Sequence, residues 1–421
     1  MKKKIAVIGG GASGMMAAIQ AAKSGASVEL YERNDRVGKK LLVTGNGKCN
    51  FSNTDINSDA YYGSAVSLCQ KLYAKFGVSE TIDCFGQMGM LIKDKNGYLY
   101  PLSEQASTVL DVLRFSLEES GVVVHTGIQI DAIIPQPDTG KLRLKPISGK
   151  AAASQKFFYD AVILACGGMA APKTGSDGNG FQIAKKLGHH IVEPVPALVQ
   201  LRCRETFLKS VAGVRTGAAL TLLIDGRERK TVQGELQLTD YGISGIPVFQ
   251  FSREAAYALS HKKKVSVEID FLPVYEQAAY EAFWSKRWAA FQKRTLEQCL
   301  MGISHKKINQ LIIRLADAKP LTVVDDLPEK TRNLIALLYR KLTVTVYAAN
   351  GFEQAQVSAG GIPAGELTEQ LESKLVPHVY FAGEIVDIDG ICGGYNLQWA
   401  WTSGTIAGRA AARNENDIQK E

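Results

Sequence analysis

The sequence predicts an α/β fold in which a domain with a parallel sheet is interrupted by a β-rich insert. Three observations lead to this prediction. The chain opens with an apolar run, a glycine-rich turn and an alanine-rich segment, which is the order of a βαβ unit. From about residue 196 polar and apolar residues alternate, as is typical of antiparallel strands. Near the end of the chain a second strand leads through a glycine-rich turn into a helix.

The N-terminal unit has the spacing of a dinucleotide-binding motif. Residues 5–8 are apolar and predict a buried strand, and Gly9, Gly11 and Gly14 follow in the pattern G-x-G-x-x-G. The first glycine permits a tight turn, the second lets a pyrophosphate approach the backbone, and the third lets helix and strand pack closely. A helix predicted over residues 15–23 would direct its free N–H groups at the phosphates.

A second strand and an acidic residue complete this unit. Residues 27–31 predict a strand, and Glu32 follows it, 23 residues after Gly9. A carboxylate about 20 residues after the glycines binds the ribose hydroxyls of a dinucleotide. Because the strand, the helix and the acid all lie where the motif requires them, we interpret this segment as a dinucleotide site and not as a plain glycine-rich turn.

Composition limits the possible classes of protein. The chain has 421 residues, of which 46% are hydrophobic and 22% charged, as in an ordinary globular protein without disorder. A net charge of +7 suits an anionic cofactor or nucleic acid, although a mildly basic surface is the simpler explanation. Seven scattered cysteines without a CxxC pair, and no signal peptide, predict a cytoplasmic protein without disulfides or bound metal. No apolar run approaches the length of a membrane span.

Changes in residue pattern divide the chain. Period-two alternation predicts antiparallel strands that form a small barrel or a curved sheet, and aromatic residues at helical spacing predict a small helical insert in which they form a core. The predicted boundaries are 1–195 and 345–421 for the Rossmann-type domain, 196–274 and 320–344 for the barrel-like domain, and 275–319 for the helical insert.

Two further glycine-rich segments extend the predicted site. Residues 44–53 are rich in glycine, asparagine and basic side chains, which offer donors to phosphates and to a polar ring edge. Residues 377–387 predict a strand that ends in glycine and acids. The glycine-rich turn over 389–398 then leads into a helix predicted over 399–413. The N-terminus of that helix can hold negative charge, such as a phosphate or a reduced flavin ring.

Several motifs occur together in this chain and indicate a protein family. They are the N-terminal glycine motif and the segments 44–53, 165–168, 242–245, 380–384 and 393–398. In this combination the chain resembles, over essentially its whole length, the BaiN-like (YhiN-like) family of bacterial NAD(P)/FAD-dependent oxidoreductases, which includes aminoacetone oxidase family FAD-binding enzymes. The resemblance implies a Rossmann-type FAD-binding domain interrupted by a β-barrel-like domain that carries a small helical insert. One departure is Ile246-Pro247, where many relatives have proline directly after Ser-Gly, and we expect only a local change there.

The resemblance also implies that residues from both ends of the chain hold FAD. The glycines of the first turn should hold the pyrophosphate, Glu32 the adenosine ribose, and the segment after Gly394 the flavin ring. The predicted cofactor-binding residues are Gly9, Gly11, Ala12, Ser13, Gly14, Glu32, Arg33, Lys40, Thr44, Gly45, Asn50, Ile130, Cys166, Gly167, Gly168, Gly383, Glu384, Asp387, Gly394, Tyr395, Asn396 and Leu397.

Several functions are compatible with these features. The resemblance implies an NAD(P)H-linked reductase of a conjugated ketone, such as a bile-acid or steroid enone, or an oxidase of a small amine such as aminoacetone. A redox sensor and an RNA-associated flavoprotein are further alternatives. The RNA alternative would use Lys286, Arg287, Lys293 and Arg294, but a solvated helix face is the commoner reason for such residues, so nucleic acid is the less favoured partner.

The sequence identifies the electron donor and the proton donor less clearly than it identifies the cofactor. No second complete dinucleotide motif is present, so NAD(P)H is expected to visit the flavin transiently. The residues with suitable proton-donor chemistry are Tyr241, Tyr395, Cys49, Cys392 and His125, and a structural role is the simpler expectation for each. The sequence predicts a small-molecule substrate and leaves the catalytic residue and the oligomeric state open.

Overall fold

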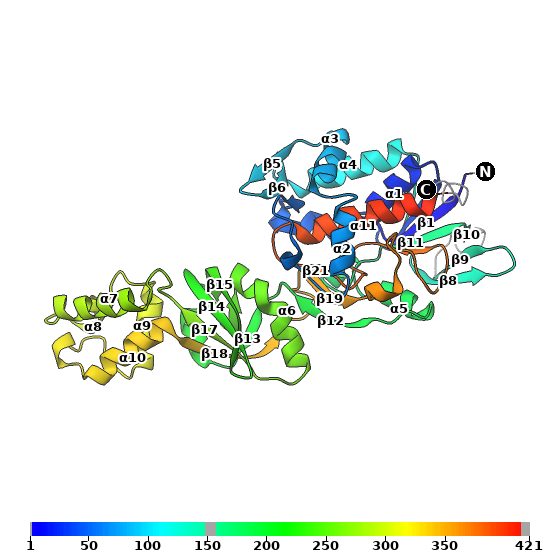
Figure 1. Cartoon of the computed structure of the whole chain (residues 1–421). Coiled ribbons are helices and arrows are strands. Elements are labelled where there is room, and N and C mark those ends of the chain that lie inside the picture. Colours follow the sequence, from blue (N-terminus) through cyan, green and yellow to red (C-terminus); the bar gives the residue numbers. More distant parts are fainter. Residues whose placement is uncertain (1, 148–156, 414–421) are drawn as a thin grey trace. The chain divides into compact units, whose positions relative to one another are not determined.

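The computed structural model describes residues 2–147 and 157–413, and the chain divides into two compact units (Figure 1). One unit comprises Met1–Val195 and Ala355–Glu421, so both ends of the chain contribute to it. The other is the continuous segment Pro196–Gln354.

A five-stranded parallel sheet organises the first unit. Its strands are β1 (Lys4–Ile8), β2 (Ser27–Glu32), β7 (Val123–Thr126), β11 (Ala161–Leu164) and β20 (Val379–Phe381), in the spatial order β20-β11-β1-β2-β7. Every neighbouring pair is parallel. The central strands are apolar runs because both faces of a parallel sheet are covered. The strand order reverses between β1 and β11, and in such sheets ligands bind at this switch point.

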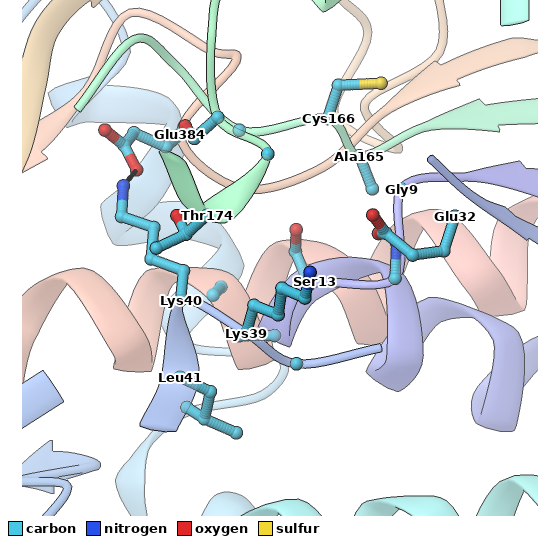
Figure 2. A pocket seen from close by; sticks show the side chains of 18 of the residues that line it. Gly9, Ser13, Glu32, Lys39, Lys40, Leu41, Ala165, Cys166, Thr174 and Glu384 are labelled. Carbon is cyan, nitrogen blue, oxygen red and sulfur yellow. Dashed lines mark hydrogen bonds and ion pairs between the residues drawn. The ribbon is translucent and has the colours of Figure 1, made fainter. Parts of the chain in front are cut away.

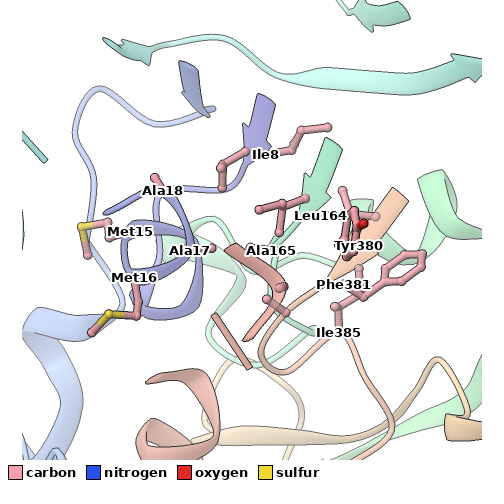
Figure 3. Close-up of a cluster of buried hydrophobic side chains, with 14 of the residues drawn as sticks. Ile8, Met15, Met16, Ala17, Ala18, Leu164, Ala165, Tyr380, Phe381 and Ile385 are labelled. Carbon is pink, nitrogen blue, oxygen red and sulfur yellow. The ribbon is translucent and has the colours of Figure 1, made fainter. Parts of the chain in front are cut away.

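Two helices cover one region of this sheet side by side. They are α1 (Ala12–Lys23) and α11 (Tyr395–Ala412), and they come from opposite ends of the chain (Figure 1). A Cβ on Gly404 or Gly408 would collide with backbone oxygens of α1, so glycine permits the close approach. The side chains of Ile8, Leu164 and Phe381, from three neighbouring strands, gather with residues of α1 in one buried cluster (Figure 3).

The predicted C-terminal helix begins earlier than the sequence indicated. Helix α11 starts at Tyr395, four residues before the predicted 399–413, because Gly394 adopts a left-handed conformation (φ 92°) that turns the chain directly into the helix. Residues 395–397 therefore belong to a helix N-terminus and not to the turn before it.

The remaining elements of the first unit lie around the sheet. They are η1 (Leu41–Gly47), β3 (Ser52–Asn53), η2 (Ser58–Ala60), β4 (Tyr61–Tyr62), α2 (Val66–Tyr73), α3 (Val78–Gln87), β5 (Ile92–Lys95), β6 (Tyr98–Pro101), α4 (Ala106–Glu119), β8 (Ile130–Gln136), β9 (Lys141–Pro146), β10 (Phe158–Tyr159), η4 (Pro172–Thr174), α5 (Asn179–Lys186), β12 (Val192–Ala197), β19 (Val357–Gly361), η7 (Ala364–Glu366) and β21 (Asp389–Gly390). Two small sheets among them have the orders β3-β6-β5 and β10-β9-β8.

The second unit contains a closed barrel, as the sequence predicted. Its strands are β13 (Leu201–Cys203), β14 (Arg215–Ile224), β15 (Arg227–Leu238), β16 (Gly242–Ser244), β17 (Val265–Asp270) and β18 (Leu342–Ala349), in the order β13-β16-β15-β14-β17-β18. Alternate residues such as Leu220, Val267 and Val344 are fully buried, which is the period-two pattern of a barrel interior.

Helices of this unit differ from the prediction in two places. Helix α6 (Ile246–Ser260) packs against β15 inside a segment that the sequence indicated as β, and Pro247 lies in its first turn, where proline is tolerated. Residues 320–344, which the sequence assigned to the barrel, hold η6 (Val324–Asp326) and α10 (Glu329–Arg340) before β18 begins. Buried Ile335 and Tyr339 lie four residues apart, which is helical spacing.

The predicted helical insert, residues 275–319, contains three helices, and the short helix η5 lies upstream of it in the sequence. These elements are η5 (Thr206–Val211), α7 (Gln277–Ala290), α8 (Leu296–Leu300) and α9 (Lys306–Leu315). Trp284 of α7 is buried and stacks on Trp288 at 4.9 Å, so the aromatic stripe forms core as predicted. Within the described ranges, the structure contains no helix that is both long and apolar enough to cross a membrane.

Candidate cofactor site

A cleft opens in the first unit at the carboxyl ends of β1 and β11. It encloses about 1220 Å³ of empty space, including open solvent at its mouth. Its walls come from the first glycine turn, the segments after β2 and β11, the loop before β8 and the first turn of α11. In Figure 2, Gly9 and Glu32 lie toward one end of the labelled residues and the Lys40–Glu384 pair lies toward the other.

Most of the predicted cofactor residues line this one cleft. They are Gly9, Gly11, Ala12, Ser13, Glu32, Arg33, Lys40, Thr44, Ile130, Cys166, Gly167, Glu384, Asn396 and Leu397. These residues come from distant parts of the chain, between Gly9 and Leu397. The parallel sheet brings them together because the carboxyl ends of its strands meet at one edge.

The three glycines of the first turn differ in how closely other atoms of the protein approach them. Gly9 has φ 106°, and a Cβ on it would collide with the carbonyl of Ala165. A Cβ on Gly14 would collide with the Gly9 carbonyl. A Cβ on Gly11, by contrast, would meet no protein atom within 4 Å. Two glycines are therefore needed for packing, and the third leaves the space beside the N-terminus of α1 open for a diphosphate.

Glu32 is held rigidly at the end of β2. Its Oε2 accepts a hydrogen bond from the Gly10 N–H at 2.8 Å, and its Oε1 accepts from the N–H and the Nδ2 of Asn34 at 2.8 and 2.7 Å. The side chain is buried, and only Oε2, which accepts a single hydrogen bond, has a further lone pair. Its fixed Oε2 could therefore accept a hydrogen bond from a ribose hydroxyl.

The opposite end of the cleft combines an ion pair with a helix N-terminus. Lys40 Nζ lies 2.7 Å from Glu384 Oε2, and Glu384 Oε1 accepts from the N–H and hydroxyl of Ser358, both at 2.8 Å. The Asn396 side chain is occupied, because it exchanges two 2.8 Å hydrogen bonds with the backbone of Gly390. Asn396 and Leu397 line the cleft in the first turn of α11, where backbone N–H groups have no partner within the helix and the helix dipole is positive.

Sequence reasoning missed the segment at the end of η4, although it identified Cys166 and Gly167 directly after β11. Thr174, Gly175 and Ser176 line the cleft, and Thr174 accepts a hydrogen bond at 3.0 Å from the Asn34 amide that also orients Glu32. The Ser176 hydroxyl is buried and has no hydrogen-bond partner among the described residues. The glycine-rich run from Gly175 to Gly180 was the available signal.

Other lining residues were not among the predicted cofactor residues, although Gly10 and Ala165 lie inside predicted motifs. They are Ile8, Gly10, Tyr31, Asn34, Gly38, Lys39, Leu41, Ile128, Gln129, Ala165, Asn179, Gln356, Val357, Ile388, Trp399 and Ala400. Most are apolar or contribute backbone, so their presence in the cleft depends on the fold and not on their chemistry.

The other predicted cofactor residues do not line the cleft. They are Gly14, Gly45, Asn50, Gly168, Gly383, Asp387, Gly394 and Tyr395. Several shape its walls: a Cβ on Gly45 would lie 2.9 Å from the Asn50 nitrogen, and buried Asp387 accepts a hydrogen bond from the Ser64 N–H at 2.8 Å. These residues hold the surrounding loops in place, and direct contact with a cofactor stays a prediction for them.

None of the five candidate proton donors lines the cleft. Burial raises the pKa of both the Cys49 and the Cys392 thiol to about 12, so neither is a reactive thiolate near neutral pH. Tyr395 donates to a backbone carbonyl at 3.1 Å, and His125 lies 3.2 Å from a carboxylate while it stacks on Tyr31. Tyr241 belongs to the other unit.

The donor set of the cleft fits FAD. The open space at Gly11 suits the diphosphate, the fixed carboxylate of Glu32 suits the adenosine ribose, and the N-terminus of α11 suits the anionic edge of a reduced ring. Ser176, whose buried hydroxyl has no partner among the described residues, also lines the cleft. When bound there, FAD supplies two-electron hydride exchange.

Comparison with known proteins agrees with this assignment. Residues 3–410 match the family model described as HI0933-like protein Rossmann domain. The chain is 39% identical over 413 residues to 3-dehydro-bile acid delta(4,6)-reductase of Clostridium scindens, which covers 97% of this chain and 99% of that protein. It is 27% identical over 403 residues to ribosomal RNA dihydrouridine synthase of Haemophilus influenzae, with 94% and 95% covered.

A solved structure of similar extent is 3-ketosteroid delta1-dehydrogenase from Sterolibacterium denitrificans. It is 14% identical with a TM-score of 0.49, and the match covers 97% of this chain and 99% of that one. The family match and the 39% identical relative extend over nearly the whole chain and confirm the predicted resemblance. The chain belongs to the HI0933-like (BaiN/YhiN-like) family and is an FAD-dependent oxidoreductase.

Proposed function

We propose that the protein reduces a carbon–carbon double bond conjugated to a ketone in a bile-acid-like or steroid-like substrate, with NAD(P)H as the electron donor. The observation that carries this proposal is the 39% identity, over 97% of the chain, to a reductase whose name specifies a 3-dehydro-bile acid and its delta(4,6) double bonds. The cleft supports it, because its donor set fits the cofactor that such a reduction needs.

The reaction is balanced by two electrons and two protons. NAD(P)H gives a hydride that ends on the β carbon of the enone, a proton from water ends on the α carbon, and NAD(P)⁺ leaves. A reduced flavin ring and the ketone oxygen of the substrate would both carry negative charge in such a reduction. The free N–H groups at the start of α11 stabilise charge of this sign at the ring end of the cleft.

A second candidate is reduction of a uracil ring in ribosomal RNA. The 27% identity to a ribosomal RNA dihydrouridine synthase favours it, and the chemistry is related, since that product also arises from a double bond conjugated to a carbonyl. The basic helix α7 supports it less. Arg287 donates to the backbone carbonyls of Cys299 and Met301 at 2.7 and 2.6 Å, so it serves the helical insert's own structure.

The experiment is an anaerobic stopped-flow screen of the FAD-loaded protein. We expect NADPH or NADH to bleach the flavin, and a 3-oxo-4-ene steroid acid to restore its colour with formation of the saturated ketone. Reoxidation by a uridine-containing ribosomal RNA fragment, but not by the enone, would favour the second candidate. Bleaching by aminoacetone alone, with peroxide on aeration, would contradict both candidates and favour the amine oxidase.

The cytoplasm is the compartment we propose for this reaction. All seven cysteines are unpaired thiols, and most are buried. Unpaired thiols persist in a reducing compartment, where NAD(P)H is also available.

A further inference from the structure

A small sheet lies beside the N-terminus of α11, at the end of the cleft where we place the flavin ring and which we call the ring end. It carries lysine and tyrosine side chains on one face. The sheet is β3-β6-β5, in which Asn53 pairs with Tyr98, Lys95 with Tyr98, and Lys93 with Tyr100. Directly paired residues share a face of a sheet, and so do residues two apart along one strand. Lys93, Lys95, Tyr98, Tyr100 and Asn53 therefore form one face, which we call the lysine–tyrosine face.

This face adjoins the ring end of the cleft. Asn53 Nδ2 donates to the Gly393 carbonyl at 2.9 Å, and a Cβ on Gly393 would lie 3.0 Å from Tyr98 Cε1. The next residue, Gly394, is the N-cap of α11, whose first turn lines the cleft. From there, the face runs outward from Tyr98 to Tyr100, about 7 Å further along the strand.

Three lysines converge at the outer end of this face. The ammonium groups of Lys93, Lys95 and Lys48 lie 2.6, 2.7 and 3.2 Å from the carboxylate of Glu104. Lys48 follows Thr44, a lining residue, in the same loop. Three positive charges against one negative charge leave a net charge of +2 here. The lysines hold the pKa of Glu104 at about 2, so this balance persists at neutral pH.

The face is accessible to a ligand. Tyr98 is 44% exposed, and the side chains of Lys93 and Lys95 are 40% and 43% exposed. Asp94, the acidic residue between the two lysines, points to the opposite side of β5, and its Oδ1 accepts a hydrogen bond from the Gly97 N–H in the turn. An aromatic surface next to the ring end, followed by a net charge of +2, matches a nicotinamide nucleoside followed by a diphosphate.

We infer that the lysine–tyrosine face, with Lys48, receives the dinucleotide electron donor: its diphosphate lies at the three lysines while its nicotinamide reaches the ring end of the cleft. This inference rests on the proposed function for the identity of the donor. It explains how a chain without a second dinucleotide motif can still use NAD(P)H, because the donor needs only a surface beside the flavin. Since both donors carry the diphosphate, the face serves NADH and NADPH alike.

The test measures flavin bleaching by NADPH and by NADH in anaerobic stopped-flow experiments, with the apparent Kd as the readout. We expect the double variant Lys93→Gln/Lys95→Gln to raise the Kd of both donors about tenfold or more, since each lost lysine removes a charge-assisted contact. The control is Lys71→Gln/Lys75→Gln, because these lysines also flank one carboxylate, that of Glu369, at 2.7 and 3.8 Å. The control should bind both donors like the wild type.

A change of opposite sign separates binding from structure. Glu104→Gln raises the net charge at the three lysines, so it should lower the Kd of both donors and steepen its salt dependence. If the lysines only stabilised the loop through Glu104, this variant would bind the donors less well. An unchanged Kd in the lysine double variant, an equal loss in the control, or no bleaching of the wild type by either donor would each overturn the inference.

Two further arms keep this result separate from the function. In the first arm, wild-type enzyme reduced by dithionite is mixed with the enone. If the enone is not reduced, the proposed function is wrong. The Kd values for NADH and NADPH still test whether the lysine–tyrosine face binds the donor. RNA is tested by a gel-shift assay with a ribosomal RNA fragment. If the double variant loses only the RNA shift and keeps its Kd for NAD(P)H, the face belongs to nucleic acid and the inference is wrong.

Discussion

At the scale of single residues, the glycines of the first turn separate packing from binding. A Cβ on Gly14 would collide with the Gly9 carbonyl, whereas one on Gly11 meets no protein atom. We therefore expect Gly14→Ala to lower the free energy of unfolding of the apoprotein by about 2–4 kcal/mol. Gly11→Ala should leave it unchanged but raise the Kd for FAD about tenfold or more, because its methyl group occupies the space of the diphosphate.

Urea unfolding of the apoproteins and fluorescence titration with FAD measure the two effects. An unchanged Kd for FAD in Gly11→Ala would show that the open space at Gly11 has no role in binding.

A second residue-scale prediction concerns pH. Burial disfavours ionisation of Glu29, but hydrogen bonds from Lys4, Tyr31 and Tyr159 outweigh it and hold its pKa at about 2, below the usual 4.5. A folded-state pKa below the unfolded one stabilises the protein above pH 4.5, and this stabilisation disappears as the pH falls toward 2. We expect Glu29→Gln to cost about 2–3 kcal/mol at pH 7 and much less at pH 3.

Urea unfolding at the two pH values tests this, with the exposed Glu119→Gln as the control. A loss that is the same at pH 3 and pH 7 would mean that the charge of Glu29 contributes nothing.

At the scale of elements, the N-terminus of α11 is the part of the site that carries a measurable electrostatic effect. Asn396 braces the preceding turn through two hydrogen bonds with Gly390 and lies beside the free N–H groups. Asn396→Asp places a negative charge there and should disfavour the reduced, anionic ring. We expect the flavin midpoint potential to fall by about 30 mV or more, which corresponds to about 1.4 kcal/mol for two electrons.

The measurement is a spectroscopic redox titration, with Asn396→Ser as the uncharged control that also shortens the brace. An equal fall of the midpoint potential in both variants would mean that the effect comes from the lost hydrogen bonds with Gly390 and not from charge at the helix N-terminus.

Elements were predictable where a local pattern decides their structure. The strands of the parallel sheet and helix α1 follow from apolar runs and glycine spacing, and the barrel follows from alternation. Helix α6 was missed although Val248, Phe251 and Ala255 have helical spacing, because strand-like segments flank it on both sides. Cleft residues such as Gln356 and Trp399 could not be predicted, since only the tertiary fold places them beside the glycine turn.

At the scale of the whole molecule, the site depends on joining the two ends of the chain. The motifs at Gly9 and at Gly383–Leu397 predicted one site, and the sheet order explains why: β20 and β1 both flank β11. Pro196–Gln354, which lies between these motifs in the sequence, forms a second unit with its own hydrophobic core around Leu236, Phe251 and Trp284. Among the described residues, all those that line the cleft belong to the first unit, so the two units should respond differently to the cofactor.

The division into two units predicts that each unit unfolds separately. Calorimetry of the apoprotein should show two unfolding transitions, and FAD at 100 times its Kd should stabilise only one of them, by about 2.7 kcal/mol. The segment 196–354, expressed alone, should fold into the barrel with its helices, reproduce the other transition and bind no FAD. A single transition that shifts as a whole with FAD would instead mean that the barrel unit unfolds together with the cofactor domain. Loss of both transitions in Gly14→Ala, but of neither in Gly11→Ala, would point to the same conclusion, because the Gly14 substitution is expected to disturb only the packing of the first unit.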